Sequence, residues 1–74
     1  MRIAASALRH GVTPEDIEHA ARFAMRRIDQ DDDVTMLLRP GQDGTLLEVG
    51  ILTLHGHVTV IHAMPARRKY LRLL

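Results

Sequence analysis

The sequence predicts an α+β fold, in which two N-terminal helices are followed by a three-stranded antiparallel sheet and a short basic C-terminal arm or helix. Three observations lead to this prediction. Alanine-rich segments with helix-boundary residues occupy the first third of the chain. Three β-rich segments, separated by short turn sequences, occupy most of the rest. The last residues are strongly basic, which predicts an arm outside the sheet; its cations are Arg67, Arg68, Lys69 and Arg72.

Length and composition predict one small folded domain. No internal repeat, low-complexity tract or linker interrupts the 74 residues, so we expect residues 1–74 to form a single domain. Hydrophobic residues make up 46% of the chain and charged residues 26%, which is typical of folded proteins and not of disordered ones. So short a chain buries a limited fraction of its surface. We therefore expect it to gain stability in a homo-oligomer or hetero-oligomer.

The absence of cysteine and of long apolar segments predicts a cytoplasmic protein. With no cysteine, the chain has neither a disulfide framework nor a thiolate zinc site or Cys nucleophile. Its longest apolar stretch, residues 46–54, is interrupted by Glu48 and Gly50. That stretch is far shorter than the roughly 20 residues that a membrane-spanning helix needs. The first residues also lack the apolar run of a secretion signal, so we expect no membrane partner.

Two helices are expected before the sheet. The alanines of IAASALRHG favour a short helix over residues 3–10, and Gly11 can adopt the left-handed conformation that ends one. In TPED, Thr13 is a good N-cap and Pro14 suits the first helical position. An apolar stripe at three- and four-residue spacing predicts that this second helix runs to about Ile28. The stripe comprises Ile17, Ala20, Ala21, Ala24 and Ile28.

Three strands are expected after the acidic loop DQDDD. They are VTMLLR (34–39), TLLEVGILTL (45–54) and VTVIHAM (58–64), joined by the turn sequences PGQDG and HGH. Pro65 has no N–H to donate to a ladder and is expected to end the last strand. A three-stranded meander has two open edges, and one of them is a place where a partner can add.

The five histidines raise the question of a metal site. His55 and His57 lie two apart in LHGH, and Glu48 or Asp43 would have to complete a His-rich site. This spacing fits no structural zinc pattern, so we interpret LHGH as a polar hairpin tip and expect no metal. Glycine-rich phosphate loops, a Ser/His/Asp arrangement and dinucleotide fingerprints are absent from the sequence. No cofactor is therefore expected.

His62 is the strongest candidate for chemistry. His10 and His19 are assigned to helix ends and surfaces, whereas His62 stands inside an expected strand. Strict alternation places it at the end of an apolar row formed by Val58, Val60 and Met64. A half-buried imidazole hydrogen-bonded to backbone is the structural interpretation. The functional one depends on the cations of residues 67–69, because a titratable base beside guanidinium groups suits chemistry on a phosphodiester.

Glu48 is a carboxylate inside the strand TLLEVGILTL. Alternation gives it the same face as Leu46, Gly50 and Leu52, so either that face is partly wet or Glu48 has a cationic partner. Arg39 and the C-terminal arginines are the candidate partners. Both a structural ion pair and a general base stay open.

The charges are distributed unevenly along the chain. The formal net charge is only +1, but the acidic residues DQDDD lie in the middle and the basic ones at the end. A field of this shape can hold a phosphate backbone at one end and repel it at the other, or the two ends can pair with each other.

Three segments carry a resemblance to a known family. ALRHGVTPEDIEHA, DGTLLEVGILT and VTVIHAMPARRKYL occur in the order of similar segments in the BrnT-like toxins of bacterial type II toxin–antitoxin systems, relatives of the RelE group. The resemblance spans about residues 7–71. It implies a small ribonuclease, free or ribosome-associated, and an antitoxin partner, often with a DNA-binding part, that covers its site. A helix over residues 3–10 would leave this chain without the family's leading strand.

The resemblance also implies roles for the residues of HAMPARRK. Arg67 and Arg68 take the place of phosphate-binding arginines. His62 stands where the family often has a serine, and Lys69 stands near a position that is often glutamate. These two departures separate the present chain from the family's pattern.

The leading hypothesis is a metal-independent endoribonuclease toxin. A ribose 2′-hydroxyl would attack the adjacent phosphate while His62 or Glu48 takes its proton. Arginine suits the stabilisation of the developing negative charge, because its planar donors grip phosphate bidentately. That task is assigned to Arg67, Arg68 and Arg39. The remaining RNA contacts are assigned to Lys69, Tyr70 and Arg72, with Tyr70 stacking on a base or protonating the leaving group.

Two alternatives remain. One is a non-catalytic interaction module, whose basic arm and sheet edge bind a partner protein. The other is a helix-turn-helix around HGVT, but Glu15, Asp16 and Glu18 at the start of the second helix would repel a DNA backbone. A neighbouring gene for a short acidic partner with a DNA-binding part would favour the toxin.

Overall fold

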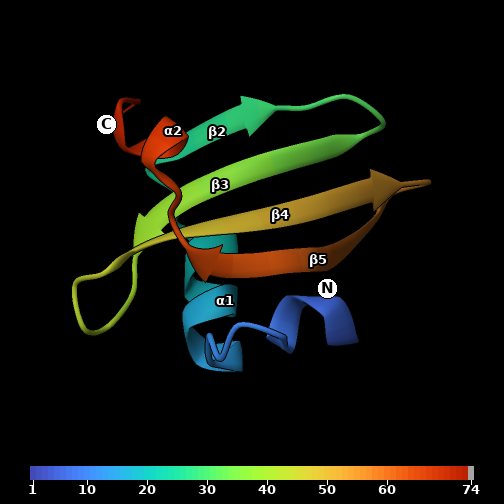
Figure 1. The fold of residues 1–74 in the computed structure, drawn as a ribbon. Coiled ribbons are helices and arrows are strands. Elements are labelled where there is room, and N and C mark those ends of the chain that lie inside the picture. Colours follow the sequence, from blue (N-terminus) through green and yellow to red (C-terminus); the bar gives the residue numbers. More distant parts are fainter. Residues whose placement is uncertain (74) are drawn as a thin grey trace.

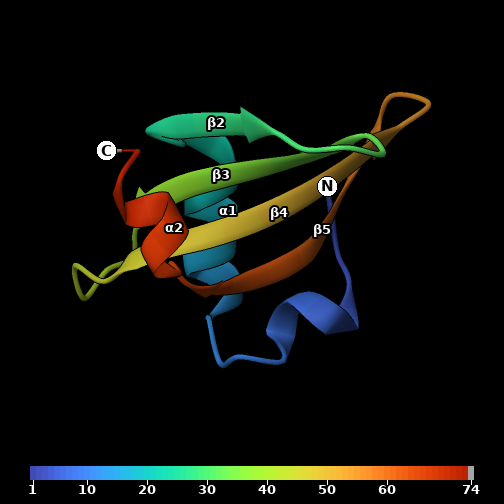
Figure 2. The same cartoon turned by 45° about the horizontal axis from the view of Figure 1, so that its top comes forward.

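The structure is a computed structural model that describes residues 1–73. In it the chain forms a five-stranded mixed sheet with one α-helix on each face (Figures 1 and 2). Its strands lie in the order β1-β5-β4-β3-β2. Only the pair β1 and β5 is parallel. The elements are β1 (Arg2–Ile3), the 3₁₀ helix η1 (Ala5–Leu8), α1 (Pro14–Arg22), β2 (Arg26–Asp29), β3 (Val34–Pro40), β4 (Leu46–Leu54), β5 (His57–Pro65) and α2 (Arg68–Leu71).

The predicted fold class is wrong at the N-terminus. Residues 3–10 do not form a helix, because β1 pairs with β5 and only a single 3₁₀ turn follows. Ile3 lies opposite Val60, and the amide of Ala4 continues the ladder by donating to the Val60 carbonyl at 2.8 Å. Long-range pairing thus overrides the local helix preference of the alanines. With η1 reduced to one turn, the helix-turn-helix alternative loses its first helix.

The second predicted helix is too long. Thr13 caps α1 as expected, with its side chain accepting from the Asp16 amide at 3.2 Å, but the helix ends at Arg22. Phe23 leaves the helical region at φ −126° and ψ 37°. The following residues form β2 as an edge strand on β3, in which Ile28 lies opposite Met36. The sheet therefore has five strands where three were predicted.

The three predicted strands are present, with each end within one residue of its expected position. The predicted alternation of β5 is wrong, however, because β5 contains a β-bulge. Gly50 of β4 pairs with His62, whereas the next residue, Ile51, pairs with Val60, so Ile61 has no partner on β4. One extra residue reverses the facing of every side chain after it. His62 therefore faces away from the side to which Val60 points.

The two faces of the sheet differ in what covers them. On the α1 face, Ile17 and Ala20 of the helix pack on the sheet in a main core; its other buried members are Ala7, Val12, Leu37, Leu47, Val49, Ile51, Val60 and Ala63. On the α2 face there is only a small cluster of Met36, Leu38 and Tyr70. The longest helix of the described part, α1, has nine residues, and no helix there can span a membrane.

Candidate functional site

Glu48 lies at the centre of the α2 face, on the middle strand β4, and its side chain is fully buried. Its carboxylate accepts four hydrogen bonds from one residue, Arg67: from the backbone N–H at 2.8 Å, from Nε at 3.1 Å to each oxygen, and from Nη2 at 2.7 Å. His62 adds a contact between Nε2 and Oε2 at 2.8 Å. We call these three residues the Glu48 cluster. A buried carboxylate is thus paired and fully hydrogen-bonded.

The partners of Glu48 keep it ionised. Burial alone would raise the pKa of Glu48, but the hydrogen bonds from Arg67 and His62 and the positive charge of Arg67 outweigh it, so the pKa lies below its ordinary value. The same contact with Glu48 raises the pKa of Arg67. The predicted cationic partner of Glu48 is therefore a C-terminal arginine and not Arg39.

The bulge in β5 brings His62 into this cluster. Without the extra residue Ile61, alternation would turn the imidazole to the α1 face. Opposite His62 stands Gly50, where an added Cβ would lie 3.2 Å from the His62 Cβ. Glycine therefore leaves room for the ring to approach Glu48. The predicted face of Glu48 was correct, whereas that of His62 was wrong.

The contact with Glu48 fixes the proton on the His62 ring. An ionised carboxylate can only accept, so Nε2 must carry a hydrogen. In the neutral imidazole this leaves Nδ1 as the acceptor. The His62 side chain is 29% exposed, whereas Glu48 is inaccessible. The imidazole of His62 is therefore accessible to a bound molecule, whereas the carboxylate of Glu48 is not.

His10 is a residue of this region that the sequence did not reveal. Its ring centroid lies 6.2 Å from that of His62, with the two planes at 70°. η1 holds His10 there, because Ser6 Oγ donates to the carbonyl of the bulged Ile61 at 2.6 Å. In the sequence His10 is one polar residue before Gly11 and was assigned to a helix end. No local pattern signals a partner so distant in the chain.

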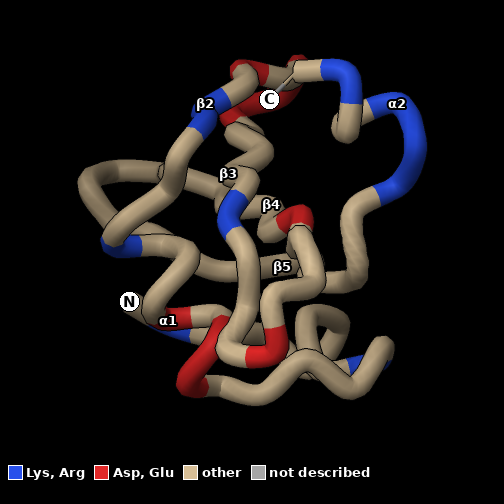
Figure 3. Tube along the Cα trace, turned by 90° about the vertical axis from the view of Figure 1, so that its left-hand side faces the viewer, with Lys and Arg blue, Asp and Glu red and all other residues tan. Residues whose placement is uncertain are grey.

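The basic arm continues from the Glu48 cluster. Arg67 is 46% exposed, and its Nη1 takes no part in the contact with Glu48. Arg68, Lys69 and Arg72 are exposed on and after α2, where the basic residues gather (Figure 3). The exposed cations therefore follow directly in the chain from Arg67, a member of the Glu48 cluster.

Tyr70 is not free to stack on a base. Its ring is only 5% exposed and packs with Met36 and Leu38. Arg67 and Lys69 lie against this ring, with the guanidinium carbon 5.6 Å and Nζ 5.0 Å from its centroid. Tyr70 therefore anchors the arm to the sheet, and the two roles expected for it do not fit its burial.

Arg39 lies on the opposite face from the Glu48 cluster. It pairs with Leu47, whose side chain belongs to the main core. Its Nη1 donates to the Phe23 carbonyl at 2.6 Å, and its buried Nε has no hydrogen-bond partner among the described residues 1–73. Arg39 thus holds the end of α1 and is not brought near Arg67 or His62.

The residues considered for a metal are not gathered together. His55 and His57 are exposed at the β4–β5 hairpin, while Glu48 is occupied by Arg67. Asp43 accepts from the Thr45 amide at 2.9 Å, and this hydrogen bond lowers its pKa. Within residues 1–73, no three histidine or acidic side chains are grouped so as to hold a metal ion.

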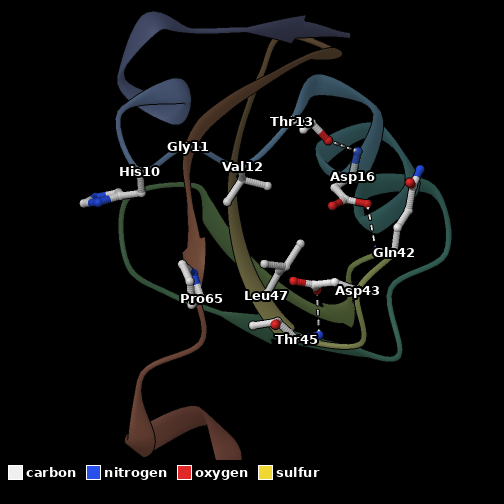
Figure 4. A pocket seen from close by; sticks show the side chains of 10 residues that line it. All are labelled: His10, Gly11, Val12, Thr13, Asp16, Gln42, Asp43, Thr45, Leu47 and Pro65. Atoms are coloured by element: carbon white, nitrogen blue, oxygen red, sulfur yellow. Dashed lines mark hydrogen bonds between the residues drawn. The ribbon is translucent and has the colours of Figure 1, made fainter.

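A separate pocket of about 330 Å³ opens between the N-terminus of α1 and the β3–β4 loop (Figure 4). Val12 and Leu47 face each other in it, and Asp16 accepts from the Gln42 amide at 3.1 Å. The ring of His10 points away from the other lining side chains. Because Leu47 belongs to the α1 face, this pocket is distinct from the Glu48 cluster.

Comparison with known proteins gives no relative. No protein-family model matches the chain, and neither curated proteins nor solved structures give a significant match. Function must therefore be argued from the Glu48 cluster and its surroundings.

Proposed function

We propose that this protein is a small RNA-cleaving toxin of a toxin–antitoxin pair, similar to the BrnT-like toxins and acting in the cytoplasm. One observation carries the proposal. A buried, ionised Glu48 contacts a partly exposed imidazole, and a cationic arm begins at the same carboxylate. This combines a proton acceptor with phosphate-binding groups, which cleavage of a phosphodiester by its own 2′-hydroxyl requires.

The N-terminal strand adds support. The sequence predicted that this chain lacks the leading strand of the BrnT-like family, but β1 supplies one beside β5. The order of elements after it also agrees with that family's helical segment, strands and basic end. We therefore include the resemblance to the BrnT-like toxins in the proposal.

In the proposed reaction, His62 Nδ1 removes the proton of the ribose 2′-hydroxyl. Glu48 does not touch the substrate; it is a positioning residue that fixes the tautomer and orientation of His62. Arg67 Nη1 and the exposed Arg68 stabilise the negative charge on the non-bridging phosphate oxygens. Lys69 and Arg72 hold the RNA backbone on either side by charge alone.

The test is induced expression of the chain in a bacterial host, with growth followed and RNA 5′ ends mapped by sequencing. The variant is His62→Ala, because its ring is partly exposed and its loss leaves the Glu48–Arg67 pair in place. The matched control is His57→Ala, on the same strand but exposed at the hairpin. We expect arrest and new RNA ends with the parent and with His57→Ala, and neither with His62→Ala.

Normal growth without new RNA ends, from parent protein shown to be folded by circular dichroism, would overturn the proposal. New ends that persist in His62→Ala would place the reaction elsewhere. An Arg67→Ala, Arg68→Ala double variant then measures how much the arm contributes, with Arg22→Ala, Arg27→Ala as the control for equal loss of charge.

The second candidate is a non-catalytic interaction module. The observation that favours it is the edge strand β2, which pairs with β3 on one side only. Phe23 and Met25 are exposed just before it, at 55% and 54%. Such an edge can accept a strand of a partner protein. A folded, non-toxic parent chain that forms a complex with the product of a neighbouring gene would favour this candidate.

A further inference from the structure

We infer that His10 is the general acid of the same site and protonates the 5′-oxygen that leaves when RNA is cut. This inference rests on the proposed function and completes it, since His62 alone accounts only for removal of a proton. The residue assigned to the leaving group from the sequence, Tyr70, is buried under Arg67 and Lys69 and cannot reach a substrate.

The position of His10 carries the inference. Its ring lies edge to face with that of His62 at 6.2 Å between centroids, close enough for one phosphodiester to meet both rings. Both rings are accessible, since His10 is exposed and His62 partly so. Glu48 contacts His62, and no hydrogen bond or ion pair ties His10 among residues 1–73. The two imidazoles therefore stand in different environments, which suits opposite roles.

Two long-range hydrogen bonds hold the segment before His10 in place. η1 is tied to β5 by Ser6 Oγ on the Ile61 carbonyl, and the Ala4 amide donates to the Val60 carbonyl at 2.8 Å. Gly11, at φ +78°, then turns the chain away toward α1. The bulge at Ile61 thus has two effects: it turns His62 to the α2 face, and it leaves a carbonyl for Ser6. The same irregularity brings both histidines together.

The reaction balances with these two residues alone. The 2′-oxygen forms a bond to phosphorus as its proton passes to His62 Nδ1. The bond between phosphorus and the 5′-oxygen breaks as protonated His10 gives that oxygen a proton. The products are a 2′,3′-cyclic phosphate and a 5′-hydroxyl. His62 is then protonated and His10 neutral, and exchange with water restores both.

The experiment compares two RNA oligomers that carry the mapped cleavage site. They are identical except that the second has sulfur in place of the 5′-bridging oxygen at the scissile bond. A thiolate leaves without a proton, so only the oxygen substrate needs a general acid. Cleavage by the purified parent, His10→Ala, His10→Gln and His57→Ala is measured with and without ribosomes, after circular dichroism establishes that each variant is folded.

We expect His10→Ala and His10→Gln to cleave the oxygen substrate roughly 10²–10⁴-fold more slowly than the parent, the range of general acid catalysis. On the sulfur substrate their loss should be less than about tenfold, and His57→Ala should keep parental rates on both. Equal losses on both substrates, or no loss, would overturn the role of His10 while leaving the ribonuclease intact. A parent that cuts neither oligomer would overturn the proposed function itself.

Discussion

The two faces of the sheet are stabilised by different physics. The α1 face is covered by a nine-residue helix and a main core of aliphatic side chains. The α2 face is covered by a four-residue helix over a small cluster, and its fully buried groups include the carboxylate of Glu48. Apolar burial stabilises the first face in proportion to area. On the second, a saturated polar contact fixes the position of a few groups and contributes little net stability.

This difference between the two faces predicts which substitutions each face tolerates. The α1 face is expected to be most sensitive to a loss of side-chain volume, and the α2 face to the loss of the ion pair between Glu48 and Arg67. The proposed site lies on the second face, where His62 has both a fixed neighbour in Glu48 and access to solvent. The expected effects of substitution follow this division.

The largest effect is expected on the α1 face. Leu37→Ala removes a fully buried side chain that lies opposite Val49 in the main core. The loss in free energy of unfolding should be about 2–5 kcal/mol, a large part of what a small domain has. Urea denaturation followed by circular dichroism measures it. A loss below about 1 kcal/mol would contradict the assignment of stability to this face.

A smaller loss is expected for Glu48→Ala. Breaking a buried ion pair costs about 3–5 kcal/mol, but the half-exposed Arg67 can regain hydrogen bonds from water, so we expect about 2 kcal/mol. Activity should disappear, because His62 loses its orientation. Glu18→Ala, on the exposed side of α1, is the control and should change stability by less than about 0.5 kcal/mol. Equal losses in free energy of unfolding for Glu48→Ala and Glu18→Ala would contradict the importance of the polar contact on the α2 face.

Gly50→Ala should have a smaller effect on stability and a clear one on the site. The new methyl group would stand 3.2 Å from the His62 Cβ and push that residue aside. Overpacking of this kind costs about 1 kcal/mol or more. The ring resonances of His62 in NMR spectra should shift, while those of His55 stay as in the parent. Unchanged His62 resonances would show that the strands absorb the methyl group.

The smallest effect concerns acid. The pKa of Glu48 is lowered in the folded state, so its contribution to stability is fully present above its ordinary value of 4.5 and is lost as pH falls through the lower folded value. Glu48→Gln has no such titration. The difference in urea midpoint between parent and Glu48→Gln should therefore shrink below pH 4.5. If the difference in urea midpoint stayed constant with pH, the contribution of Glu48 to stability would not depend on its negative charge.

The sequence predicted the middle of the molecule well and its edges badly. Strands β3, β4 and β5 carry their own signals, in β-branched residues bounded by turn sequences. β1 and β2 are short and are defined by pairing with distant strands, so alanines before Leu8 and an apolar spacing up to Ile28 indicated helices instead. Local preference is a weak guide where a segment only completes a sheet.

The site was predicted in part for the same reason. Glu48 and His62 stood out as polar groups in apolar strands, and Arg67 as part of the basic segment after Pro65; the structure brings these three residues together. Alternation failed for His62, because nothing in VTVIHAM marks Ile61 as a bulge. The position of His10 beside His62 was missed, and the phosphate-binding role expected for Arg39 does not fit its place, since the partners of both residues are fixed only by the fold.

The parallel pairing of β1 with β5 also bears on the order of synthesis. A ribosome adds about 5–20 residues per second, so β1 emerges several seconds before its partner strand has been made. α1 and the antiparallel pairs from β2 to β4, by contrast, join segments that are near one another in the sequence. Until β5 has been made, β1 has no partner strand and His10 has no His62 beside it, so the pair of histidines is assembled by the one parallel contact between distant parts of the described chain.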